Sequence, residues 1–123
     1  MKLRLLDDSI RLRLSQSEVI AADEAGVVES RTCFPGGTAL TYALEAADDS
    51  AQASAVFAAE RMVVRLPASE IAAWANDDAA VSLHGDLQLP SGGSLKLLVE
   101  KDFRCLSPRD DEDQSDLFTN PEA

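Results

Sequence analysis

Four basic side chains near the start of the chain form the clearest group that could do chemistry. Lys2, Arg4, Arg11 and Arg13 alternate with leucine and isoleucine along residues 2–6 and 9–14, on either side of Asp7-Asp8. Such alternation predicts two antiparallel strands, each with one apolar face and one charged face. Ammonium and guanidinium groups gathered on one face can hold a phosphate or a carboxylate.

The turn between these two segments sets how they pair. A two-residue loop at Asp7-Asp8 places Leu5 opposite Ile10 and Arg4 opposite Arg11, so that the apolar side chains share one face. Like charges directly opposite one another destabilise a sheet by a few tenths of a kcal/mol. We therefore expect anionic groups beside the cations. They could be a bound ligand, or carboxylates of the last strand or of the acidic tail in an ion-pair ladder.

Other side chains offer weaker candidates for chemistry. Glu45, Glu100 and Asp102 could supply oxygen ligands for Mg²⁺ beside the cations, as in barrels that bind polyphosphates. Triphosphate-tunnel enzymes, however, carry alternating glutamates in their N-terminal strand, where this hairpin carries only Lys and Arg. His84 is the only histidine, so neither a catalytic triad nor a zinc site is indicated. We expect no cofactor.

Composition limits the class of protein and its partners. The net charge of −11 would repel nucleic acid and anionic membrane surfaces, and no apolar run is long enough to span a bilayer. Cys33 and Cys105 lie far apart and form no CxxC motif, which predicts two free, mostly buried thiols in a reducing compartment. We expect a soluble cytoplasmic protein with one domain over residues 1–108 and an acidic tail over residues 109–123.

Hydrophobic periodicity predicts a mainly β (α+β) fold of about seven strands with two short helices. The first helix starts at Ser15 or Ser17, where Ser15 and Glu18 have the spacing of a capping box, and the second is capped by Ser69 and places Trp74 over the sheet. Short connections favour one antiparallel sheet curled into a barrel or half-barrel, with a two-layer α+β sheet as the alternative. The predicted strands are residues 2–6, 9–14, 26–34, 39–47, 53–66, 80–89 and 94–106, although the alanine-rich start of 53–66 is equally compatible with helix.

The order of these segments resembles a family of small bacterial proteins known only as a domain of unknown function. The resemblance covers nearly the whole chain and implies no activity, cofactor or catalytic residue. Thr119 departs from the proline expected in such relatives. The resemblance is carried by residues 9–19, Leu40-Thr41-Tyr42-Ala43-Leu44-Glu45, Leu66-Pro67 with Trp74-Ala75, residues 99–103 with Cys105-Leu106, and Asn120-Pro121 after an acidic run.

The tail contains one short motif. Gln114-Ser115-Asp116-Leu117-Phe118 resembles the pentapeptide that binds bacterial sliding clamps, in which the glutamine and the final Leu-Phe pair fill pockets on the clamp. The alternative interpretation is that Leu117 and Phe118 pack against their own sheet.

The sequence therefore predicts a small non-enzymatic protein that binds an unidentified protein partner or self-associates, through a sheet edge or through the cationic face. The first alternative is an anion-binding or metal-dependent phosphohydrolase-type barrel that uses Lys2, Arg4, Arg11 and Arg13. The second is a protein whose tail binds a sliding clamp through Gln114, Leu117 and Phe118.

Overall fold

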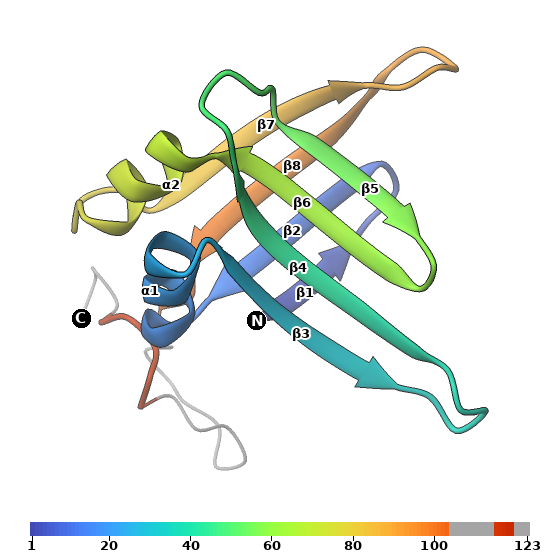
Figure 1. The fold of residues 1–123 in the computed structure, drawn as a ribbon, viewed down its shortest axis with the longest axis horizontal. Coiled ribbons are helices and arrows are strands. Elements are labelled where there is room, and N and C mark those ends of the chain that lie inside the picture. The colour runs from blue at the N-terminus through green and yellow to red at the C-terminus, as the bar shows by residue number, and fades with distance from the viewer. Residues whose placement is uncertain (104–114, 120–123) are drawn as a thin grey trace.

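A computed structural model describes residues 1–103 and 115–119 of the chain. These residues form two four-stranded sheets and two helices, and Figure 1 shows one sheet in front of the other. Sheet A has the order β1-β2-β8-β7, and sheet B has the order β3-β4-β6-β5. The elements are β1 (Lys2–Leu5), β2 (Ser9–Leu14), α1 (Gln16–Glu24), β3 (Val27–Cys33), β4 (Ala39–Ala47), β5 (Ser54–Ala58), β6 (Arg61–Pro67), α2 (Ala68–Ala75), β7 (Ser82–Gln88) and β8 (Ser94–Lys101).

The prediction of a mainly β fold with two helices is confirmed, but the prediction of one seven-stranded sheet or barrel is wrong. The four hairpins are antiparallel, whereas the central pairs β2–β8 and β4–β6 are parallel. These parallel partners are not consecutive in the chain, so reasoning from short connections could not foresee them. The two sheets remain separate, since each has its own strand order with two edges.

The chain contains two copies of one strand-strand-helix-strand-strand unit. The first unit runs from β1 to β4 through α1, and the second runs from β5 to β8 through α2. Each sheet takes one hairpin from each unit, and exchanging the units converts the order of sheet A into that of sheet B. The registers agree as well, because Arg13 pairs with Glu100 between β2 and β8, and Arg65 pairs with Glu45 between β6 and β4. The two units are therefore related by a pseudo-two-fold axis.

The second unit also explains why the predicted strand over 53–66 is wrong. That segment forms two strands, β5 and β6, joined at Ala59 and Glu60. Both residues have positive φ, 51° and 62°, and Asp7 has φ 49° in the equivalent turn between β1 and β2. Positive φ usually calls for Gly or Asn, so the sequence carries no turn signal here. The helix that follows is preceded by Pro67, and not by the predicted cap Ser69.

The hydrophobic core lies between the two sheets, and the helices cover one of its ends side by side (Figure 1). The predicted register of the first hairpin is confirmed, so Leu12 points into the core with 1% of its surface exposed. The prediction that Trp74 packs over the sheet is also confirmed, since it is 1% exposed and its Nε1–H donates to the Val81 carbonyl at 3.0 Å. Within the described residues, neither helix is long and apolar enough to cross a membrane.

Candidate anion-binding face

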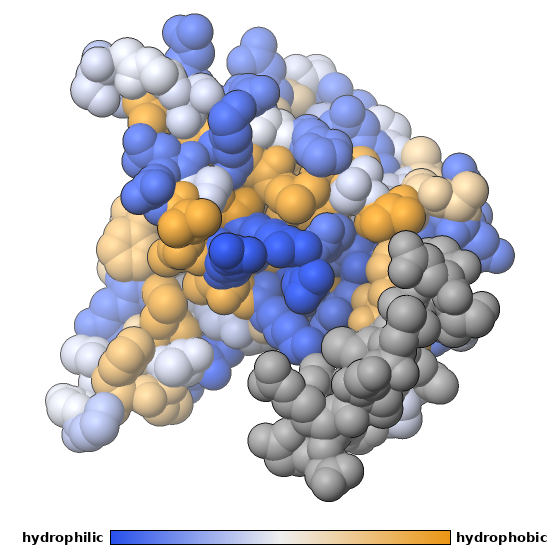
Figure 2. All heavy atoms as spheres, turned by 180° about the vertical axis from the view of Figure 1, so that it is seen from behind, coloured by the Kyte–Doolittle hydropathy of each residue, from blue (hydrophilic) through white to orange (hydrophobic). Residues whose placement is uncertain are grey.

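Five cations share the outer face of sheet A, which is called the cationic face below. They are Lys2 and Arg4 on β1, Arg11 and Arg13 on β2, and Lys96 on β8. They alternate along their strands with core residues such as Leu12 and Leu97, so they must point away from the core. Figure 2 views the molecule from this side and shows hydrophilic side chains gathered in the middle of the face, with hydrophobic surface around them.

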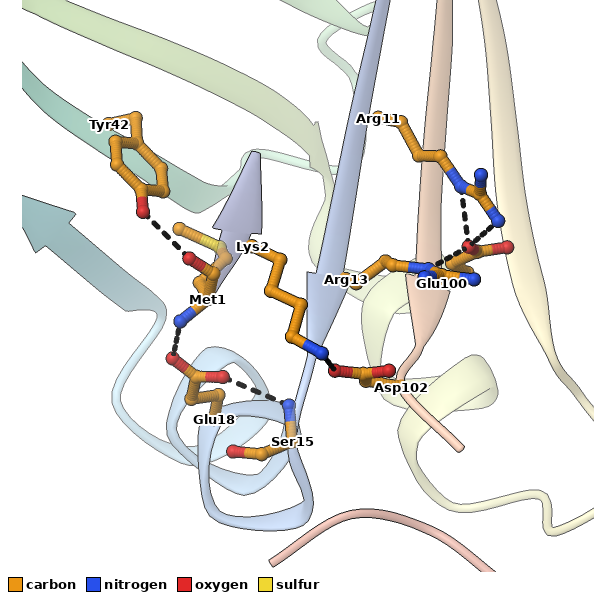
Figure 3. Close-up of polar contacts among 9 residues, drawn as sticks. All are labelled: Met1, Lys2, Arg11, Arg13, Ser15, Glu18, Tyr42, Glu100 and Asp102. Atoms are coloured by element: carbon orange, nitrogen blue, oxygen red, sulfur yellow. Dashed lines mark hydrogen bonds and ion pairs between the residues drawn. The ribbon is translucent and has the colours of Figure 1, made fainter. Parts of the chain in front are cut away.

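Two of the cations share one carboxylate of the same sheet (Figure 3). Glu100 Oε1 accepts from Arg11 Nε at 2.6 Å and from Arg13 Nε at 2.8 Å. The last strand therefore lies beside the hairpin, as the ion-pair interpretation expected. Among the described residues, two guanidinium groups thus share a single carboxylate, which balances one of their two positive charges.

Lys2 lies at the start of β1 and is held by a buried acid. The Lys2 Nζ is 3.0 Å from Oδ2 of Asp102, and the side chain of Asp102 is 7% exposed. The amino group of Met1 contacts Glu18, which also accepts from the Ser15 backbone N–H at 2.9 Å (Figure 3). The Tyr42 hydroxyl donates to the Met1 carbonyl at 2.7 Å. These contacts tie the edge strand of sheet A to α1 and to sheet B.

Arg4 and Lys96 differ from the other three cations. Among the described residues, Arg4 has no hydrogen-bond or ion-pair partner, and its side chain is exposed. Lys96 has only a long contact of 3.5 Å with Asp86, and both of these side chains are mostly exposed. A contact of this kind contributes little in water. Within the described residues, Arg4 and Lys96 are therefore the cations of this face that carboxylates hold least.

The described residues line two recesses on the cationic face. The smaller, of about 150 Å³, is lined by the four predicted cations together with Leu3. The larger, of about 330 Å³, is called the sheet A pocket below, and it brings together Arg4, Arg11, Lys96 and His84. The rest of its lining is Leu6, Ser9, Ile10, Leu97 and Leu98. A pocket of this kind can bind the charged end of a molecule on one side and its apolar part on the other.

Comparing equivalent positions of the two sheets distinguishes contacts that recur in both sheets from contacts found in sheet A alone. Arg13 with Glu100 and Arg65 with Glu45 occupy equivalent positions, and both pairs form. This ion pair is therefore a shared part of the framework. In contrast, the positions of Arg4, Arg11 and Lys96 are occupied on sheet B by Val56, Val63 and Thr41. The fold accepts neutral residues at these three positions.

The same comparison explains why the sheet A pocket is open. Sheet B has Arg61 at the position of Ser9, and Glu29 at the position of His84. Arg61 Nη1 lies 2.5 Å from Glu29 Oε2, and Arg61 Nη2 lies 3.2 Å from Glu45 Oε2. The long arginine side chain thus crosses the outer face of sheet B. On sheet A the short Ser9 side chain leaves that space empty, and its hydroxyl donates to the Leu6 carbonyl at 2.6 Å.

The charges on sheet B affect the titration of Glu45. Burial raises the pKa of this carboxyl group, but hydrogen bonds from Arg65 and Arg61 and their positive charges outweigh burial and hold the pKa below its ordinary value. Glu45 is therefore ionised at neutral pH and serves as an ion-pair partner.

The predicted metal ligands are not brought together. Glu45 lies on sheet B, whereas Glu100 and Asp102 lie on or just after β8 in sheet A, and all three are held by basic side chains. Among the described residues, no three His, Cys, Asp or Glu side chains are grouped so that they could hold a metal ion.

The described part of the tail packs on the protein itself. Leu117 is 8% exposed, and the Phe118 ring lies 5.7 Å from the Phe103 ring. Gln114 lies outside the described residues. A clamp would therefore reach the Leu-Phe pair only if this segment left its own core.

The prediction of buried thiols is wrong for Cys33. Cys33 is exposed at the end of the edge strand β3, and Cys105 lies outside the described residues. Sequence reasoning assigned Cys33 to the interior because free cysteine is usually buried. The usual burial of free cysteine does not apply to a residue at the end of an edge strand, where the side chain is exposed.

Of the sheet A pocket, sequence reasoning assigned only Arg4 and Arg11 to a site, and it missed the outward-facing residues that β7 and β8 contribute, namely Lys96, His84 and Leu98. The alternation along 82–88 and 94–101 places all three on one face. That signal identifies the pocket only when β8 is known to lie beside β2.

These features define a small two-sheet β protein with a duplicated framework and a positively charged outer face. The chain belongs to a family of unknown function, DUF7009, whose family model matches residues 1–122. Comparisons with curated proteins and with solved structures give no match.

Proposed function

We propose that this protein is a non-enzymatic binding module that holds an anionic ligand against its cationic face, at Arg4 and Arg11. The observation that supports the proposal is the difference between the two equivalent faces. The framework needs the ion pair of Arg13 with Glu100, because its counterpart recurs on sheet B. It does not need Arg4 or Arg11, since Val56 and Val63 serve in their places.

The local charge supports an anion as the ligand. The whole chain carries a net charge of −11, yet five of its eleven Lys and Arg residues lie on this one face. Among the described residues, Arg4 lacks a partner, and Glu100 is the single carboxylate that Arg11 and Arg13 contact. A guanidinium group presents parallel N–H donors that match a carboxylate or a phosphate.

The side chains around the pocket are better suited to binding than to catalysis. Acid–base or nucleophilic chemistry needs a nucleophile, a base and a group that orients the base. His84 is the only base of the pocket, and its one polar contact among the described residues is Ser82 Oγ on the same strand, at 3.3 Å. A ligand held by Arg4 and Arg11 would therefore be retained without being converted.

The proposal is tested by titrating the protein with pyrophosphate and following its backbone amide signals by NMR. We expect saturable changes on β1, β2 and β8, which weaken as salt is added. Arg4→Val and Arg11→Val copy residues that sheet B already accepts, and each should weaken binding about tenfold. Arg31→Gln is the matched control, because Arg31 is exposed on β3 of sheet B and its loss changes the net charge by the same amount.

Two results would contradict the proposal. One is the absence of saturable changes on these strands with pyrophosphate and with the organic anion octanoate. The other is binding that Arg31→Gln weakens as much as Arg4→Val does. An enzymatic role is tested separately with a panel of phosphate esters in Mg²⁺ or Mn²⁺. We expect no turnover, and hydrolysis that Arg11→Val abolishes would replace the binding function with a catalytic one.

A further inference from the structure

We infer that the ligand of the sheet A pocket is a small organic carboxylate with an apolar body. This inference rests on the proposed function of the cationic face and specifies its ligand. The carboxylate would lie between Arg4 and Arg11, and the apolar body would lie against Leu98 and Leu6.

The lining of the pocket calls for an apolar body. Leu98 and Leu6 contribute apolar side chains on the outer face, and Lys96 and the arginines add the aliphatic parts of their side chains. Leu98 points outward from β8 and is only half-buried, while Leu6 is 56% exposed. An inorganic anion would leave these apolar walls in contact with water. A ligand with a hydrocarbon body would cover them, which is favourable in proportion to the area removed from water.

Sheet B shows that this apolar surface is not required by the fold. The positions of Leu98 and Leu6 are occupied there by Ala43 and Ala58. Arg61 and Glu29 fill the equivalent space with an ion pair, whereas Ser9 and His84 leave it open on sheet A. Sheet A thus has larger apolar side chains where sheet B has alanines, and a short side chain where sheet B has an arginine. Both differences favour a ligand with an apolar part.

The size of the pocket limits the body. Its volume of about 330 Å³ is near the lower end of the range for ligand pockets. At roughly 30 Å³ for a water-sized group, it has room for about eleven non-hydrogen atoms. A carboxylic acid of about eight carbons fits this volume, and octanoate is therefore the probe.

The test measures the affinities of four compounds for the full chain by calorimetry. Octanoate combines the charged end and the apolar body, acetate has the charged end alone, octanol has the body alone, and pyrophosphate has charge without a body. We expect octanoate to bind at least tenfold more tightly than acetate, because each buried methylene contributes about fourfold. We expect the same advantage over octanol, because octanol lacks the carboxylate that Arg4 and Arg11 would hold. If octanoate binds no better than acetate or octanol while pyrophosphate binds, this inference is wrong and the proposed function stands. If neither anion binds, both are wrong.

A double variant transfers the arrangement of sheet B to sheet A. Ser9→Arg with His84→Glu recreates the pair that Arg61 and Glu29 form, and it leaves the net charge unchanged. We expect this variant to lose octanoate affinity at least tenfold and to keep its pyrophosphate affinity within about threefold. Equal octanoate affinity in the folded variant would overturn the inference. If the double variant fails to fold, Leu98→Ala replaces it, because this change copies Ala43 of sheet B. It should lower the affinity for octanoate about fivefold without changing the affinity for pyrophosphate. An unchanged octanoate affinity would overturn the inference equally.

Discussion

Removing the charge of Glu45 tests whether the duplicated ion pair stabilises the framework. Glu45 accepts from Arg65 Nε at 3.0 Å and from Arg61 Nη2 at 3.2 Å. Glu45→Gln keeps the shape of the side chain but replaces a charged acceptor with a neutral amide. Arg61 retains its contact with Glu29, whereas Arg65 loses the only carboxylate it contacts among the described residues.

The expected cost follows from the partial burial of the group. The side chain of Glu45 is 26% exposed, and those of Arg61 and Arg65 are 37% and 42% exposed. A fully exposed pair contributes about 0.2–1 kcal/mol, and a hydrogen bond to a charged group contributes about 1.5–3 kcal/mol. We therefore expect Glu45→Gln to lower the free energy of unfolding by about 1 kcal/mol. An unfolding entropy of about 2.1 cal/mol/K per residue converts this loss to a decrease in Tm of about 4 °C.

The pH dependence of the effect has a definite sign. The pKa of Glu45 is lowered in the folded protein, so its carboxylate stabilises the fold above the unfolded-state pKa. This contribution is lost as the pH falls through the lower, folded-state pKa. The difference in Tm between the natural protein and Glu45→Gln should therefore be constant near neutral pH and should shrink in acid.

The assay is thermal unfolding followed by circular dichroism at neutral pH and at several acidic pH values. Glu60→Gln is the matched control, because Glu60 is exposed in the β5–β6 turn and its side chain has no ion pair among the described residues. Equal Tm values for the two variants would refute the stabilising role of the pair. A difference that grew in acid would refute the assigned sign.

Two further predictions concern sheet A and the core. Glu100→Gln should lower the free energy of unfolding in urea by about 1–2 kcal/mol, because Arg11 and Arg13 lose their shared carboxylate. The same change should tighten pyrophosphate binding, and weaker binding would contradict an anion site on the cationic face. Trp74→Phe should cost about 2–3 kcal/mol, because it removes buried volume and the hydrogen bond from the indole N–H to the Val81 carbonyl, which keeps only the Lys101 backbone N–H as a donor. An unchanged unfolding midpoint would show that the indole ring contributes nothing to stability.

Local patterns predicted the first hairpin correctly. The alternation of leucine with Lys or Arg gives the strands, and a two-residue turn fixes the pairing of Leu5 with Ile10. In a strand with one buried face, a slip of one residue would turn every leucine outward, so the register has a single favourable solution. The capping box of Ser15 and Glu18 is equally local, and it is present at the start of α1.

Local sequence patterns did not predict which strands from different parts of the chain pair to form each sheet. The parallel pairs β2–β8 and β4–β6 join strands from different units, and the sequence between them does not specify their pairing. One signal was present, because Arg13-Leu14 with Ser17-Glu18 recurs as Arg65-Leu66 with Ser69-Glu70. Recognising this repeat would have shown that residues 53–66 correspond to residues 1–14, and so form two strands.

The candidate site was predicted in part for the same reason. Alternation along one hairpin identified Lys2, Arg4, Arg11 and Arg13, because a single pair of strands determines their shared face. Lys96, His84 and Leu98 come from a different hairpin, so their approach to Arg4 depends on the pairing of β8 with β2. The partners of the cations depend on the same pairing, since Glu100 faces Arg13 only in that register.

The exchange of hairpins between the two units has a consequence for biosynthesis. Sheet A requires β8, which is made long after β2, so a growing chain exposes one side of β2 until most of the protein has been synthesised. Unpaired strands invite pairing with other chains, and charged side chains on such a strand discourage it. Arg11 and Arg13 would thus protect the nascent chain from aggregation before they meet Glu100.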